Sequence, residues 1–161
     1  MKKLFRRCNF FRAAFLILMC MFSGTLGAEQ VTVKVPASVI FTIHNISAST
    51  TGSPTATVTF SSASLTSGHK LQIAVKAAAS NFTKSWGTAI AANKVSWTTS
   101  GASGGTGSSG TLSSSAYTTA FLSNQNPTSG SITLTFTLAA PGSGTEAGTD
   151  TLQLTWQFSS I

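Results

Sequence analysis

Residues 131–138 read Ser131-Ile-Thr-Leu-Thr-Phe-Thr-Leu138, a run in which every second residue is apolar. Side chains of a strand point alternately to opposite faces, so Ile132, Leu134, Phe136 and Leu138 share one face and threonines occupy the other. The run therefore predicts a β-strand with one face in a core and the other in solvent.

The same period of two recurs along most of the chain, and helical periodicity is nearly absent. With turn-rich stretches between the runs, about eight strands are predicted. Many short strands of this kind favour an all-β fold, an immunoglobulin-like antiparallel sandwich. The apolar residues expected to face its core are Val39, Phe41, Val58, Phe60, Ile73, Val75, Leu134, Phe136, Leu154, Trp156 and Phe158.

One segment departs from this pattern, because residues 100–110 consist almost entirely of Gly and Ser. Such a composition offers little to bury and gives the backbone maximal freedom. We expect a flexible Gly/Ser loop near residues 100–116. It is not a domain boundary, since too few residues lie on either side for two cores, and residues 29–161 are expected to form a single domain.

The start of the chain has the pattern of a secretory signal peptide. Five basic residues within the first dozen precede an apolar run over 13–22, which is too short to span a bilayer, and small residues follow it. We expect residues 1–28 to be removed, by cleavage after Gly27 or Ala28. The mature protein is then secreted, extracellular or on the cell surface, without a transmembrane segment.

Subtracting this leader leaves a chain with very little charge. Five lysines stand against Glu29, Glu146 and Asp150, a formal net charge of +2, and no arginine or cysteine is left. No basic stripe supports nucleic-acid binding. A disulfide is excluded as well, so stability must come from packing and strand pairing.

Few residues of the types that usually carry out catalysis are present in this sequence. The sequence Gly101-Ala-Ser103-Gly-Gly105 matches the nucleophile pattern G-x-S-x-G, but no helix pattern follows it, and both His44 and His69 lie upstream. Three acidic residues and two histidines without ligand spacing predict neither an acid/base pair nor a metal site. The chain is expected to be no enzyme and to bind no cofactor or metal.

Aromatic side chains leave a binding function open. Trp97 and Trp156 are in phase with core residues, whereas Trp86 and Tyr117 are candidate surface aromatics that could stack on sugar rings. The alternative function is accordingly a secreted carbohydrate- or surface-binding module, with polysaccharide as partner and Trp86 and Tyr117 as its ligand aromatics.

The ending Ala147-Gly-Thr-Asp150-Thr-Leu-Gln-Leu-Thr-Trp-Gln-Phe158 resembles the closing strand of secreted bacterial pilin-like sandwiches, including the spore-coat U type. In these proteins Gly and Asp precede an alternating strand. The chain departs from the usual pattern of chaperone–usher subunits in having no cysteine after the leader and no aromatic next-to-last residue. The resemblance implies a structural role, as a subunit of a surface fibre or coat in which an N-terminal segment completes a neighbour's sheet.

Low charge and long alternating strands point the same way, because few lysines protect the strand edges against strand addition. We expect a non-enzymatic structural protein that self-associates, or joins other subunits in a surface fibre, pilus or coat, through strand pairing. The predicted assembly strand is the terminal, alternating segment with Val31, Val33 and Val35, which Pro36 ends. The alternative is that this segment is simply the first strand of a monomer, with Lys34 protecting its edge.

Overall fold

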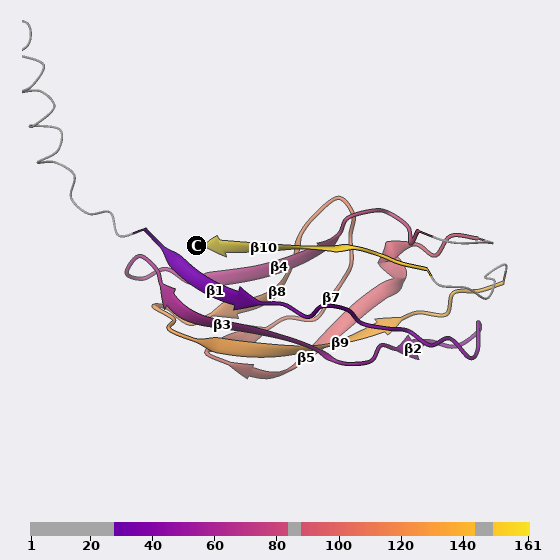
Figure 1. Ribbon diagram of the computed structural model, residues 1–161, viewed down its shortest axis with the longest axis horizontal. Helices are drawn as coiled ribbons and strands as arrows, with labels where there is room; N and C mark the ends of the chain where they lie inside the picture. Colours follow the sequence, from indigo (N-terminus) through magenta and orange to yellow (C-terminus); the bar gives the residue numbers. More distant parts are fainter. Residues whose placement is uncertain (1–27, 84–87, 144–149) are drawn as a thin grey trace, which may run out of the picture.

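The computed structural model describes residues 28–83, 88–143 and 150–161, and confirms the all-β sandwich (Figure 1). The predicted leader lies outside the described residues, apart from Ala28. The larger sheet contains β1 (Gln30–Lys34), β2 (Thr50–Thr51), β3 (Ala56–Ser64), β5 (Val95–Ser103), β7 (Gly110–Thr111) and β9 (Gly130–Leu138). The smaller sheet contains β4 (Leu71–Ala77), β6 (Gly105–Gly107), β8 (Thr118–Ser123) and β10 (Leu154–Ser160). A 3-10 turn, η1 (Ala92–Lys94), precedes β5.

Strand β9 is the centre of the larger sheet, between β3 and β5. Its apolar residues are all buried, as the alternation predicts, and its threonines lie half-buried on the outer face. Thr133 is opposite Thr57 on β3 and opposite Ser100 on β5. Threonine pairs well with itself across strands, so this face is covered with hydroxyls without any charge on β9.

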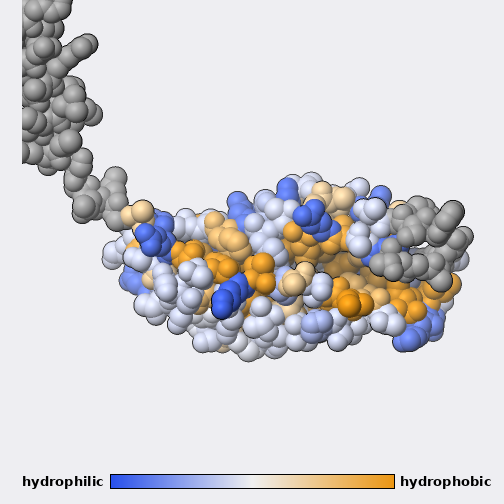
Figure 2. Space-filling model, in the orientation of Figure 1, coloured by the Kyte–Doolittle hydropathy of each residue, from blue (hydrophilic) through white to orange (hydrophobic). Residues whose placement is uncertain are grey.

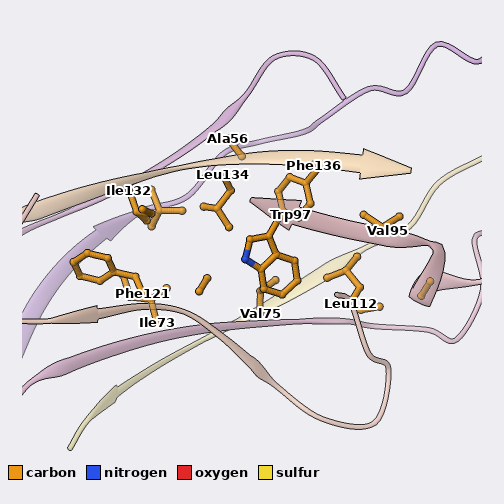
Figure 3. Close-up of a cluster of buried hydrophobic side chains, with 14 of the residues drawn as sticks. Ala56, Ile73, Val75, Val95, Trp97, Leu112, Phe121, Ile132, Leu134 and Phe136 are labelled. Carbon is orange, nitrogen blue, oxygen red and sulfur yellow. The ribbon is translucent and has the colours of Figure 1, made fainter. Parts of the chain in front are cut away.

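The core between the sheets is built largely from aromatic and branched side chains (Figure 3). The Trp97 and Phe136 rings of the larger sheet lie 6.0 Å apart, and the Phe60 and Phe121 rings meet across the sandwich at 5.7 Å. The Trp97 indole N–H donates to the Ser108 carbonyl oxygen at 2.9 Å, so the one polar atom of this buried ring is satisfied.

With β8 left aside, the order of six strands matches the immunoglobulin arrangement; β8 lies on the other side of β4 from β10 and has no part in this match. If β1, β3, β4, β5, β9 and β10 are lettered A to F in chain order, the larger sheet reads A-B-E-D and the smaller sheet pairs F with C. These are the neighbours that strands A to F have in immunoglobulin domains. Seven of the eight expected strands form, and the expected strand over residues 38–43 does not. The short pieces β2, β6 and β7, of two or three residues each, bring the number of strands in the described residues to ten.

Most of residues 100–111 form strands of the two sheets in place of the expected Gly/Ser loop. Strand β5 continues to Ser103, the chain then crosses to the smaller sheet as β6, and it returns as β7. Glycines are needed here for close packing: a Cβ on Gly107 would stand 2.5 Å from Ile132 Cδ1, and one on Gly110 would stand 2.5 Å from Trp97 Cζ2. Within the expected loop, the longest stretch outside a strand is residues 112–116, and residues 104, 108 and 109 also lie between strands.

Two details of the predicted core also differ. Residues 38–43 form no strand, and the only ladder contact is the isolated bridge between Ile40 and Ser53, although Val39 and Phe41 do pack against the core. Phe158 has the predicted phase but is 40% exposed. Both differences lie on the same side of the sandwich.

Candidate functional site: the open side of the sandwich

The predicted assembly strand forms β1, at the edge of the larger sheet. It pairs antiparallel with β3, and Val33 lies opposite the buried Phe60. Val31 and Val33 are nevertheless only half-buried, and Val35 lies beyond the end of the strand with 41% exposure. Its other edge pairs with no strand of the described chain, so β1 keeps free backbone groups along one side.

Strand β10 occupies the corresponding edge of the smaller sheet. It pairs along its whole length with β4, which places Phe158 opposite Ile73 and Trp156 opposite Val75. Ile73 and Val75 are almost fully buried, whereas Trp156 is half-buried and Phe158 is exposed. The inner face of β10 is therefore only partly covered, and the outer edge of β10 has no partner among the described strands.

These two strands and the segment 35–43 make up what we call the open side. Most of the half-buried apolar residues that pack against the core belong to it: Val31, Val33, Val39, Phe41, Ile43, Leu154 and Trp156. Figure 2 shows apolar surface gathered along this side, with a hollowed apolar stretch next to β10. Within β1 and β10 the only charged residue is Lys34, so the open side has little of the edge charge that deters strand addition.

A polar cluster closes one end of the open side. Glu29, just before β1, accepts the backbone N–H of Thr66 at 2.7 Å, and its carboxylate lies 3.3 Å from His69 Nδ1. The same His69 nitrogen is 2.8 Å from the Ser160 hydroxyl, at the end of β10. Hydrogen bonds from Thr66, then from Ser160, and the nearby His69 lower the pKa of Glu29 from 4.5 to about 2.

This cluster contains a serine, a histidine and an acid, but its geometry differs from that of a catalytic triad. In a triad the serine and the acid contact opposite nitrogens of the imidazole ring. Here both Ser160 and Glu29 face Nδ1, so no proton can pass from one partner through the ring to the other. The arrangement holds chain segments together.

Of the two candidate ligand aromatics, Tyr117 alone lies within the described residues. Tyr117 is 37% exposed, and the Lys76 ammonium lies 4.8 Å from its ring centroid, which occupies one of the two ring faces. Trp86 lies outside the described residues. The carbohydrate-binding alternative therefore stays a prediction.

A further hollow of the described surface lies mostly outside the open side. This hollow of about 270 Å³ is lined by the segment 42–51, including His44 and Asn45. This volume falls below the roughly 300–1,000 Å³ of ordinary ligand pockets. Within residues 28–83, 88–143 and 150–161, no group of three His, Cys, Asp or Glu side chains is placed to hold a metal, and no helix is long and apolar enough to cross a membrane.

Sequence reasoning found β1 but missed the polar cluster. Glu29, His69 and Ser160 are far apart along the chain, and none of them belongs to a motif with fixed spacing. The sequence feature that points to the cluster is the small number of acidic residues, of which Glu29 is one. Their meeting follows from the pairing of β1 with β3 and of β10 with β4, which the sequence pattern alone does not specify.

Known proteins give no further guide to the site. No protein family, curated protein or solved structure matches this chain. A function must accordingly be argued from the open side itself.

Proposed function

We propose that this protein is a non-enzymatic structural subunit of a surface fibre, pilus or coat, and that it assembles through strand pairing at the open side. The observation that carries the proposal is the accessible inner face of β10, where Phe158 faces the core side of the sheet and is still 40% exposed. A residue of this kind is ordinarily covered in a finished sandwich.

The immunoglobulin arrangement explains what is missing there. Its second sheet contains strands C, F and G, with F between C and G. In this chain β4 and β10 take the places of C and F, and no described strand takes the place of G beside β10. A strand added at that edge would complete the backbone pairing of β10 and cover Trp156 and Phe158.

The first strand of a second copy has the right properties for this position. Segment 31–35 is extended and alternating, so Val31, Val33 and Val35 fall on one face and can cover the apolar inner side. Thr32 and Lys34 fall on the other face and stay in solvent. In such strand addition, main-chain hydrogen bonds supply affinity and alternate side chains supply specificity.

The proposal that the protein is exported rests on residues 1–28. The proposal that it is a fibre or coat subunit is supported by residues 147–158. A leader like residues 1–28 would send the mature chain out of the cytoplasm. The similarity of residues 147–158 to the closing strand of pilin-like and spore-coat U-like sandwiches agrees with a fibre or coat subunit. Its partners are then copies of itself or other surface subunits.

Two complementary variants test the proposal. Deleting residues 29–35 removes the donor strand, and Phe158→Asp places a charge on the acceptor edge. We expect the unaltered protein to form concentration-dependent oligomers by light scattering and filaments or a coat by electron microscopy. Each variant alone should be monomeric and keep the circular dichroism spectrum of a folded β-sandwich, and a mixture of the two should form a 1:1 dimer.

The matched control is Ser159→Asp, which adds the same charge to the opposite face of β10 and should assemble like the unaltered protein. Assembly by Phe158→Asp equal to that of the control would contradict the open side as acceptor. An unaltered protein that is monomeric at every concentration, without surface polymer, would overturn the assembly function and favour the binding-module alternative.

A further inference from the structure

The two edge strands of the open side belong to different sheets. Strand β1 pairs only with β3, and β10 pairs only with β4, so no ladder of hydrogen bonds joins them. The polar cluster is the link between them: Glu29 precedes β1, Ser160 ends β10, and His69 lies in the turn between β3 and β4. Figure 1 shows the beginning of β1 and the end of β10 at the same end of the sandwich.

Strand β1 is weakly held at this end by its own pairing. It has five residues, and its register with β3 shifts between Gln30 and Thr32, so the ladder is interrupted next to Glu29. Its inward side chains Val31 and Val33 are half-buried and gain only part of the stabilisation that a core residue gains. The attachment of Glu29 to Thr66 and His69 therefore holds the strand where its pairing fails.

The chemistry of the cluster suits a contact that holds but can be opened. An ionised carboxylate makes stronger hydrogen bonds than a neutral acceptor does. The cluster lies at the surface, however, with side-chain exposures of 44% for His69 and 31% for Glu29, so water can replace each partner as the contact opens. The chain has only three acidic residues after the leader, and one of them is placed here.

We propose that Glu29, His69 and Ser160 form a clamp that keeps β1 on its own sandwich and controls its release for pairing with another copy. The consequence for assembly rests on the proposed function above. The clamp itself is a property of the single chain, because opening it exposes β1 whether or not a second copy is present.

Hydrogen exchange tests the clamp directly. It is measured on the protein as purified from its natural host, at a concentration low enough to keep it monomeric. Glu29→Gln keeps the shape of the side chain and removes its charge, and Ser160→Ala removes the hydroxyl at the β10 side. We expect the amides of residues 31–34 to exchange roughly three- to tenfold faster in both variants. Amides of β9 should be unchanged, which shows that the fold is intact.

Two controls match these variants. Ser159→Ala removes the neighbouring hydroxyl, which lies on the opposite face of β10, and Glu146→Gln removes the same charge from another part of the chain. Neither should alter exchange in β1. Equal exchange in clamp variants and controls would overturn the clamp.

The assembly rate then separates the two proposals. Faster association of Glu29→Gln than of Glu146→Gln, together with faster exchange in β1, supports control of assembly by the clamp. Faster exchange in variants that never associate, under conditions where the unaltered protein also stays monomeric, would leave the clamp standing and overturn the assembly function. Faster exchange with an unchanged association rate would overturn the control of assembly by the clamp.

Discussion

The two long sides of the sandwich are closed in very different ways. On one side the chain passes from β5 to β6 and back to β7, and so ties the sheets together with a segment of Gly, Ser, Thr and Ala. On the other side two strands rich in Val, Leu, Trp and Phe face each other without full cover. The side whose composition suggests looseness is packed, and the side whose composition suggests a core is open.

The composition of a segment indicates how much apolar surface it can bury. Whether that surface is in fact buried depends on which strands or side chains pack against the segment. Gly107 approaches Ile132 and Thr99 so closely that any larger residue would collide with them. Phe158 has a large apolar ring, but β10 has a strand of the described chain on one side alone, and the ring stays 40% exposed. A segment of low sequence complexity can thus form closely packed strands.

The largest expected effect compares the same residue type on the two sides. Trp97→Ala, at a ring that is 2% exposed, should lower the free energy of unfolding by about 3–5 kcal/mol. Trp156→Ala, on the open side, should cost about half as much, because the half-buried ring loses less contact. Urea denaturation measures both, and equal losses would show that the open side is in fact closed.

A smaller effect tests the packed side through its glycines. Gly107→Ala should destabilise the fold by about 1–3 kcal/mol, because the added methyl collides with Ile132 and Thr99. Ser109→Ala, two residues further on and exposed, should change stability by less than about 0.5 kcal/mol. A neutral Gly107→Ala would mean that this segment is as loose as its composition suggests.

The smallest expected effect is the pH-dependent contribution of Glu29, at the end of the open side, to the stability of the fold. The folded-state pKa of Glu29, about 2, lies below its ordinary value of 4.5, so its stabilising contribution is present above pH 4.5 and is lost as the pH falls toward 2. Glu29→Gln should remove this acid-dependent part. Acid titration of both proteins, followed by thermal unfolding, should show the two stability curves converging between these pH values.

Much of the fold was predictable because the alternation in β3, β4 and β9 states which residues face inward, and Val58, Ile73 and Leu134 are buried as expected. Residues 38–43 show the limit of that reasoning. Their alternation indicates burial, and Phe41 does pack on the core, but a ladder also needs a partner strand, and only Ser53 is available there.

The candidate site was predictable only in part. A terminal alternating segment before Pro36 identified β1, since edge strands near chain ends carry their own signal in the sequence. The exposure of Phe158 could not be predicted, because phase says which way a side chain points and not whether anything covers it. The clamp needed residues from three separate segments to be placed together by the sheet topology.

The closeness of Glu29 to Ser160, both in contact with His69, has a topological consequence. Domains whose ends lie together tolerate circular permutation. A chain in which Ile161 runs through a short linker into Ala28, with new ends opened in the exposed turn 44–49 at the far end of the sandwich, would retain each of the strands described above (Figure 1). Strand β1 would then be tethered at both of its ends, so it could still pair along its edge but could no longer swing out as a free arm.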